Sequence, residues 1–318
     1  MIPMLFIMDG PERIHPKRDT TFAFMREAQA RGHRIAHTRR EWIWYQGGRT
    51  HCRWLACQVT DRDPPAHFDL GEAHEGPIEE HRVVFVRTDP PFDMEYVKLT
   101  WLLDVVDRSK TLIINEPAGI RAASEKLYTL HFPELTPRTL VTRDPKRLES
   151  FLDDCGGTMV IKPVDLMGGY GVFIVRREDP NRGALIETST RDGRDLIVAQ
   201  EYLPEAKEGD KRIILLEGEP VGAVLRVPGA GDHRGNIHVG AKTVAAEITR
   251  RDREIAAALA PALERDGLYF VGIDVIGGRL TEVNVTSPTG VQEIARLSGV
   301  DLAAKVIDFA ERRAPPGR

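Results

Sequence analysis

The sequence predicts an α/β domain on a mostly parallel sheet, followed by an α+β part with two lobes. In the first third of the 318 residues, short apolar segments alternate with helical ones, whereas paired strands dominate afterwards. Crossover connections between alternating strands and helices make neighbouring strands parallel. We expect an N-terminal domain over 1–122 and a second unit over 123–318, with lobes spanning about 123–200 and about 201–312.

The N-terminal domain is expected to contain four buried strands and two helices. The strands are expected at Met4–Met8, Arg34–Thr38, Val83–Val86 and Thr111–Asn115, and the helices at Thr20–Arg31 and about Met94–Ser109. Thr50–Asp61 should be extended, and the polar, turn-rich stretch Pro64–Pro77 should form a loop. Parallel sheets bind ligands at the carboxyl ends of their strands, which here lie near Asp9 and Arg87–Phe92.

The second unit is dominated by hairpins. The expected strands are Thr158–Pro163 paired with Val172–Arg176, then Val198–Tyr202, Ile213–Leu216 and Pro220–Val227, and a hairpin over Tyr269–Val285. Helices are expected around Ser124–His131, over Pro145–Asp153 and Arg251–Arg265, and at the end of the chain.

Charge and composition exclude several classes of protein. The formal net charge of -4 leaves no broad basic surface for a nucleic-acid backbone. No apolar run approaches the roughly 18–20 residues that span a membrane, so no membrane segment is expected. The apolar start, Met1–Asp9, lacks a basic n-region and is interpreted as a buried strand. The three cysteines are odd in number and irregularly spaced, which favours free thiols and a cytoplasmic location.

A glycine-rich turn between two strands is the first candidate site. No P-loop motif occurs, and Gly169-Tyr-Gly171 is a weak dinucleotide fingerprint because Ile174 replaces its third glycine. Lys162 lies inside an apolar strand, where an unpaired ammonium is costly. Gly168, Gly169 and Gly171 let the backbone approach an anion closely. Lysine and loop together suit the phosphates of ATP, although a strand-end lysine beside a structural turn remains the alternative.

The hairpin near the end of the chain is the second candidate site. Glu282 and Asn284 alternate with apolar residues and therefore project from one face of a strand. Oxygen ligands of this kind suit Mg²⁺ that holds nucleotide phosphates. A two-residue turn at Gly277-Gly278 would place Asp274 on the opposite face, whereas a three-residue loop or a bulge would bring it opposite Glu282. We predict the latter; the alternative is a solvated outer face.

Several motifs, in order along most of the chain, resemble the prokaryotic glutathione synthetases of the ATP-grasp superfamily. They are Arg87-Thr-Asp-Pro-Pro-Phe-Asp93, Ser124-Glu-Lys-Leu127, Leu135-Thr-Pro137, the Lys162–Gly171 loop, Gln200-Glu-Tyr-Leu-Pro204, Gly209-Asp-Lys-Arg212, Arg226-Val-Pro228, Arg234-Gly-Asn236, Gly272-Ile-Asp274 and Thr281-Glu-Val-Asn-Val-Thr-Ser-Pro-Thr289. The resemblance implies a pre-ATP-grasp domain followed by a two-lobed ATP-grasp domain.

The resemblance also implies a nucleotide site. Its ATP-binding residues would be Lys126, Lys162, Gly168, Gly169, Gly171, Gln200, Glu201, Tyr202, Leu203 and Asp210, with adenine beside the Gln200–Leu203 linker. Asp274, Glu282 and Asn284 would bind Mg²⁺, with Mn²⁺ as a second candidate. Arg212, Arg226 and Arg234 would be the catalytic arginines, binding the substrate carboxylate and the acyl phosphate. Gly229–Gly240 would be the lid that excludes water.

The activity implied is the ATP-dependent ligation of γ-glutamylcysteine to glycine through an acyl phosphate, in a homo-oligomer that is often a tetramer. Four positions depart from the family pattern and lie where substrate recognition is expected: Thr88, Ser124, the Ile237–Gly240 segment and Gln292. They support a first alternative, an ATP-grasp ligase with another acid and amine. A second alternative is an ATP-binding regulatory protein without catalysis, against which the intact lysines and metal ligands argue.

Overall fold

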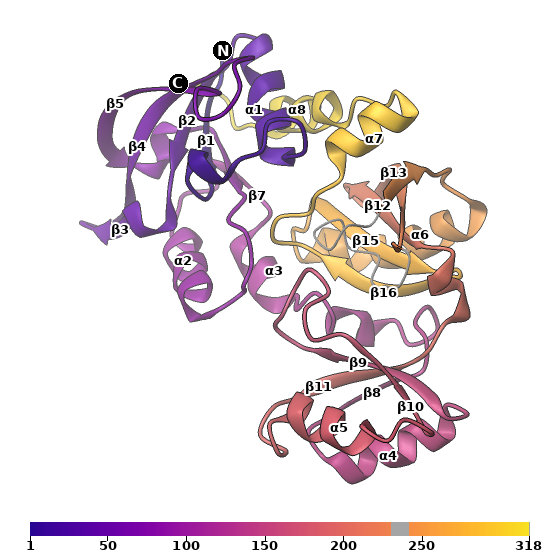
Figure 1. Cartoon of the computed structure of the whole chain (residues 1–318). Helices are drawn as coiled ribbons and strands as arrows, with labels where there is room; N and C mark the ends of the chain where they lie inside the picture. The colour runs from indigo at the N-terminus through magenta and orange to yellow at the C-terminus, as the bar shows by residue number, and fades with distance from the viewer. Residues whose placement is uncertain (230–241, 318) are drawn as a thin grey trace.

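The parallel half of the N-terminal sheet is present as predicted. The computed structural model describes residues 1–229 and 242–317. Within them, the N-terminal sheet runs in the order β3-β4-β2-β1-β6-β7, with β5 paired to β4 (Figure 1). The strands that pair in parallel are β1 (Pro3–Ile7), β2 (Arg34–Thr38), β6 (Val83–Val86) and β7 (Leu112–Ile114).

Alternation along these strands separates two apolar faces. Leu5 and Ile7 pack with α2 (Met94–Asp104) and α3 (Pro117–Ala122), whereas Met4 and Phe6 pack with α1 (Thr20–Ala30) and with α8 near the chain's end. Helix α2 ends at Asp104, earlier than the sequence predicted, because the prediction extended it to about Ser109.

Three antiparallel strands extend this sheet: β3 (Ile43–Gln46), β4 (Arg49–Val59) and β5 (Phe68–Pro77). The loop predicted over Pro64–Pro77 is wrong from Phe68 onward, because that stretch pairs with β4 from Val59↔Phe68 to His51↔Pro77. The residues at 69–75 are all exposed. An edge strand with both faces in solvent has no apolar alternation, so its sequence looks like that of a loop.

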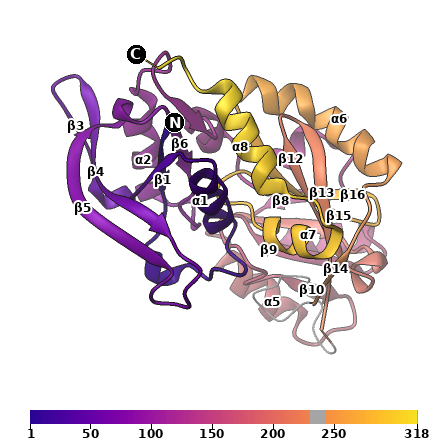
Figure 2. The same ribbon diagram turned by 90° about the horizontal axis from the view of Figure 1, so that it is seen from above.

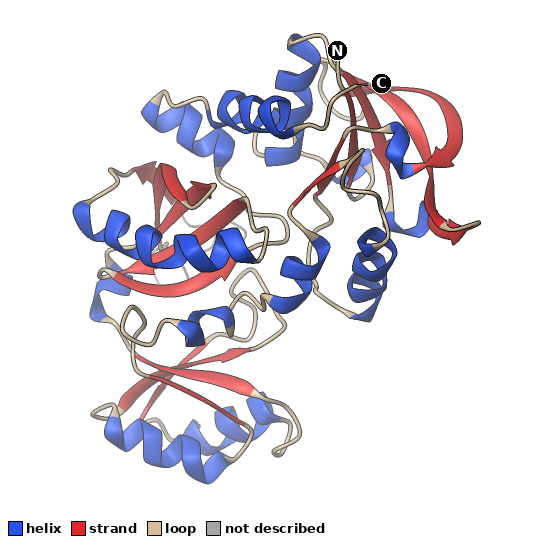
Figure 3. Cartoon of the chain, turned by 180° about the vertical axis from the view of Figure 1, so that it is seen from behind, coloured by secondary structure: helices blue, strands red, loops and turns tan. Residues whose placement is uncertain are grey.

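The central lobe is a four-stranded antiparallel sheet in the order β10-β9-β11-β8. Its strands are β8 (Thr139–Thr142), β9 (Thr158–Pro163), β10 (Phe173–Arg176) and β11 (Ile197–Glu201). Helices α4 (Pro145–Asp154) and α5 (Arg182–Thr190), the latter not predicted, cover the face turned away from the C-terminal lobe (Figure 3). The opposite face is therefore left for a ligand between the lobes.

The helix predicted around Ser124–His131 is mostly wrong. The described chain forms α3 before it and a short 3-10 turn over Tyr128–His131. The backbone carbonyl of Glu125 accepts a hydrogen bond from the Val283 N–H (2.9 Å), so this stretch is anchored to a strand of the other lobe.

The C-terminal lobe is built on a sheet in the order β14-β13-β12-β15-β16. Its elements are β12 (Asp210–Leu216), β13 (Glu219–Val227), β14 (Lys242–Ala245), α6 (Arg250–Arg265), β15 (Phe270–Ile276), β16 (Arg279–Asn284), α7 (Val291–Ser298) and α8 (Leu302–Arg313). Helix α8 returns to lie beside α1 (Figure 2), where Arg31 forms ion pairs with Asp308 and Glu311. The last helix thus packs the C-terminal lobe against the N-terminal sheet.

None of the helices in the described ranges is both long and apolar enough to cross a membrane.

The β15–β16 hairpin confirms the predicted bulge. Ile276 pairs with Arg279 across a two-residue turn, in which Gly277 and Gly278 have φ of +55° and +73°. The register then shifts beside Asp274, which comes to lie opposite Glu282. One extra residue in the ladder puts both carboxylates on the same face.

Candidate active site

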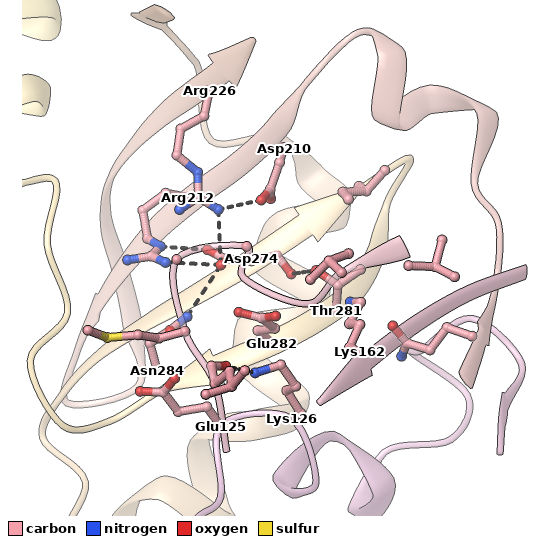
Figure 4. Close-up of a pocket in the computed structure, with 18 of the residues that line it drawn as sticks. Glu125, Lys126, Lys162, Asp210, Arg212, Arg226, Asp274, Thr281, Glu282 and Asn284 are labelled. Carbon is pink, nitrogen blue, oxygen red and sulfur yellow. Dashed lines mark hydrogen bonds and ion pairs between the residues drawn. The ribbon is translucent and has the colours of Figure 1, made fainter. Parts of the chain in front are cut away.

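A cavity between the central and C-terminal lobes gathers most of the predicted site residues (Figure 4). The central lobe contributes Val160, Lys162 and Ile174, and the C-terminal lobe contributes its buried carboxylates. Asp89 and Pro90, which follow strand β6 of the N-terminal domain, line the same cavity. The carboxyl end of the parallel sheet therefore meets the cleft between the lobes, as expected for an α/β sheet.

Two lysines point into this cavity (Figure 4). Lys162 lies on β9 opposite Val198, and its ammonium makes no hydrogen bond or ion pair within the described residues. Burial lowers the pKa of Lys162, and the nearby charge of Glu282 opposes that shift. Lys126 is buried, and its Nζ donates to the Leu166 carbonyl at 2.5 Å. A partly buried ammonium without a direct partner, as at Lys162, favours an anionic ligand in the cavity that it faces.

The glycine loop has the backbone conformation that the sequence predicts. Gly168, Gly169 and Gly171 have φ of +68°, +79° and +70°, a region that other residues rarely adopt. A Cβ at Gly171 would lie 2.6 Å from Pro163 Cγ, so a side chain does not fit there. Gly168 and Gly169 line the cavity, whereas Gly171 closes the turn against Pro163.

The end of β11 and the linker after it form one wall of the cavity. All four predicted residues, Gln200, Glu201, Tyr202 and Leu203, line it. The Gln200 amide is buried and donates to Thr139 Oγ1 at 3.1 Å. Glu201 accepts two hydrogen bonds from Arg138.

Two arginines and two aspartates form a buried network on the other wall (Figure 4). Arg212 donates to both oxygens of Asp274 (2.5 and 2.9 Å), and Arg226 Nη2 bridges Asp274 (3.0 Å) and Asp210. Burial alone would raise the pKa of Asp274, but the two guanidinium charges outweigh it and hold that pKa well below its usual range. For Asp210, burial dominates and raises the pKa to about 6.

Arg226 keeps one donor free. Its Nε is buried and has no hydrogen-bond partner within the described residues. Because a buried unsatisfied donor is costly, this nitrogen would be stabilised by an acceptor that can reach it.

The three predicted metal ligands are neighbours on the β15–β16 hairpin. Asp274 and Glu282 are paired across the strands, and Asn284 Nδ2 lies 3.4 Å from Asp274 Oδ2. In the described part of the chain, the Glu282 carboxylate makes no hydrogen bond or ion pair, and it lines the cavity. No group of three or more His, Cys, Asp or Glu side chains there could hold a metal by itself. The Glu282 carboxylate and the side-chain oxygens of Asp274 and Asn284 fit a divalent cation. A bound ligand would complete the coordination of that cation.

Family comparison agrees with this geometry. The family described as prokaryotic glutathione synthetase, N-terminal domain, matches residues 2–121, and prokaryotic glutathione synthetase, ATP-grasp domain, matches residues 125–299. The chain belongs to the prokaryotic glutathione synthetase family.

Individual members of the prokaryotic glutathione synthetase family are similar over nearly their whole length. A glutathione synthetase of Thermosynechococcus vestitus is 46% identical over 313 residues, covering 95% of this chain and 97% of that one. One from Shewanella oneidensis is 41% identical over 314 residues, covering 98% and 99%.

Solved ATP-grasp ligases share the fold. D-cycloserine synthetase DcsG has a TM-score of 0.67 at 16% identity, covering 98% of this chain and 99% of that one. The ligase PsnB, solved with a minimal precursor, Mg and ADP, has a TM-score of 0.63 at 15% identity, covering 99% and 98%.

Glu125 is a charged cavity residue that the sequence did not single out in this family member. Glu125 lines the cavity, accepts a hydrogen bond from Thr286 Oγ1 (3.0 Å), and has a pKa raised by burial and by Glu282. It stands beside Lys126 in the Ser124-Glu-Lys-Leu127 motif, so the motif contained the signal.

The positions that depart from the family pattern have varied surroundings. Thr88 is buried, and Gln292 donates to the carbonyls of Pro16 and Asp19 on the N-terminal domain. Arg234 and the Ile237–Gly240 segment lie outside the described residues, as does the proposed lid from residue 230 onward.

Proposed function

We propose that this chain joins γ-glutamylcysteine to glycine at the expense of ATP, giving glutathione, ADP and phosphate. The observation that supports this most directly is the convergence of unpaired Lys162 and unpaired Glu282, from facing lobes, on one cavity. Phosphoryl transfer needs positioning and charge neutralisation more than covalent help from the protein. A lysine and a glutamate that line the cavity without a direct protein partner supply both.

The two lysines and the glycine loop would bind the phosphates, and the Gln200–Leu203 wall would bind adenine. In the first step, an oxygen of the cysteinyl carboxylate of γ-glutamylcysteine attacks the γ-phosphorus, and the bond from phosphorus to the ADP oxygen breaks. The carboxylate thereby gains a leaving group that it lacks. In the second step, glycine's amine attacks the acyl carbon, loses a proton, and phosphate departs.

Arg226 would bind the substrate carboxylate and then the acyl phosphate through its unsatisfied Nε. Arg212 would act beside it, and Arg234 would join them from the segment outside the described residues. Asp210 would keep Arg226 oriented toward the nucleotide.

Asp274, Glu282 and Asn284 would hold Mg²⁺, or Mn²⁺ in its place. Such an ion supplies charge neutralisation on the phosphates when it is bound. The chain's own part is to present the Glu282 carboxylate in the cavity, with no direct ion pair to a described residue.

The domain division at 122/123, with lobes meeting near residue 200, belongs to the same proposal. It is supported by the separate sheets on either side of these points. A cytoplasmic location is supported by Cys52, Cys57 and Cys155, which are free thiols. We also propose a homo-oligomer, with a tetramer as the favoured form, on family resemblance alone.

The test is ADP release by the purified protein with ATP, Mg²⁺, γ-glutamylcysteine and glycine, with mass analysis of the product. We expect ADP matched by glutathione, and no ADP above background when the acid is left out. A panel of amines in place of glycine is the control for acceptor choice. ADP matched by a different peptide would support the alternative ligase, and bound ATP without acid-dependent ADP release would support the regulatory protein.

A further inference from the structure

Arg87, directly after strand β6, is a buried cation that the nearby carboxylates of Asp19 and Asp89 attract without a direct ion pair. Its side chain is 4% exposed and forms no ion pair within the described residues. The guanidinium lies 5.8 Å from the ring centre of Phe24 and 5.7 Å from that of Phe270. One of its nitrogens, Nη1, is buried without a hydrogen-bond partner. A buried charge in this state costs stability, and packed apolar side chains often replace such groups without loss.

The two hydrogen bonds of Arg87 lead to the active site. Nε donates to Thr21 Oγ1 at 3.0 Å, and Nη2 donates to the Pro288 carbonyl at 3.1 Å. Pro288 belongs to the segment 286–289, which follows the metal-bearing strand β16 and lines the cavity throughout.

The next carbonyl in that segment contacts the buried arginine network. Thr289 O accepts a hydrogen bond from Arg212 Nη1 at 3.4 Å, and Arg212 holds both oxygens of Asp274. A continuous path therefore runs from Arg87 through Pro288 and Thr289 to the Asp274 carboxylate.

The docking of the hairpin on the N-terminal domain has a separate anchor. Asn115, directly after the neighbouring strand β7, donates to the carbonyls of Phe270 (2.8 Å) and Val285 (2.9 Å). Its Oδ1 accepts from the Phe270 N–H at 2.8 Å. These bonds already fix β15 and β16 against the domain, so Arg87 is not required for docking.

We propose that Arg87 is a positioning residue for the ligase reaction. It fixes the 286–289 segment and, through Thr289, the orientation of Arg212 on Asp274. This inference rests on the proposed function. Its physical basis is that the protein retains a buried, incompletely satisfied cation whose hydrogen bond to the cleft ends on a backbone carbonyl of the active-site wall.

The test compares Arg87→Met and Arg87→Lys with the wild-type protein. In Arg87→Met we expect little change in Tm, because removing the desolvation cost of a buried charge offsets the lost attraction to Asp19 and Asp89. We expect kcat for ADP release to fall by about 10- to 100-fold, since a displacement of about 1 Å at a reacting centre costs about that much. ATP affinity, titrated without the acid, should stay near the wild-type value. Lysine keeps the charge but lacks the fork that reaches Thr21 and Pro288 together, so kcat should stay low.

Arg121→Met is the matched control. Arg121 is a partly buried arginine of the same domain that bonds Thr100 Oγ1 (2.9 Å) and Asp104, away from the cavity. Its loss should lower Tm and leave kcat unchanged.

Two results would overturn the inference: wild-type kcat in Arg87→Met, or wild-type kcat in Arg87→Lys if the methionine variant does not fold. A lower Tm with unchanged kcat would assign Arg87 a purely structural role. If the wild-type protein itself releases no ADP in response to the acid, the proposed function fails, and the inference fails with it.

Discussion

Replacing Lys162 with methionine tests whether the central-lobe lysine acts on the phosphates. Lys162 is partly buried on β9 and lines the cavity, its ammonium has no hydrogen-bond or ion-pair partner in the described chain, and desolvation lowers its pKa. Methionine keeps the length of the apolar stem and removes the charge. The substitution therefore separates an electrostatic role from a packing role.

The expected loss can be sized from the geometry. Removing one preorganised donor that faces developing negative charge costs about 10²- to 10³-fold in kcat, or about 2.7–4 kcal/mol. Tm should rise or stay constant, because an ammonium without a direct partner is exchanged for an apolar group. A lower kcat together with an unchanged or higher Tm would indicate that Lys162 has an electrostatic role.

The assay measures kcat from acid-dependent ADP release and Tm from thermal unfolding, for wild type and Lys162→Met. Lys98→Met is the matched control, because Lys98 is exposed on α2 and forms an ion pair with Glu95. It should leave both quantities unchanged. If Lys162→Met keeps wild-type kcat, or if its Tm falls sharply, Lys162 is structural and the reasoning from its missing partner is refuted.

Three further predictions concern the charged groups of the structure. Glu282→Gln should raise the Mg²⁺ concentration for half-maximal ADP release, since it removes the unpaired carboxylate; an unchanged magnesium titration would exclude it from the metal site. Asp274→Asn leaves Arg212 without its buried counter-charge and should cost about 3–5 kcal/mol in urea unfolding; a loss near zero would mean that the pair does not stabilise the fold. Burial lowers the pKa of His37 and His81 to about 4, so the unfolded chain binds protons first as pH falls below 6.5. Their contribution to stability is therefore present above pH 6.5 and lost toward pH 4; His37→Leu should flatten the fall of Tm over this range, and an equal fall in both proteins would contradict it.

Sequence reasoning succeeded where a local pattern determines the geometry. The alternation of Glu282 and Asn284 with apolar residues fixed their common face, and the need to bring Asp274 opposite Glu282 required a bulge or a longer loop. The structure has the bulge. Sequence reasoning failed for β5, whose exposed stretch has no apolar period. It also failed for Ser124–His131, where hydrogen bonding to β16 replaces a helix.

The partners of Asp274 could not be predicted in the same way. Arg212 and Arg226 come from other strands of the sheet, and nothing local in the sequence says that both guanidinium groups converge on a carboxylate assigned to a metal. Strand order and tilt decide that convergence. Asp274 therefore pairs with two arginines and also lines the cleft. Sequence motifs alone do not reveal this double role.

The charge balance of the cleft leads to a strict requirement for a divalent cation. Among the described residues of its walls, six acidic side chains stand against four basic ones: Asp89, Glu125, Glu201, Asp210, Asp274 and Glu282 against Lys126, Lys162, Arg212 and Arg226. A triphosphate therefore enters a site whose cations are already offset by carboxylates, and the charge of Glu282 attracts Lys162 without a direct ion pair. Its added negative charge needs further neutralisation in a low-dielectric cleft, where unbalanced charge is costly. Chelation of divalent ions should therefore abolish ADP release, and raising the concentration of monovalent salt should not restore it. ADP release that persists after chelation would show that the lysines alone neutralise the phosphates.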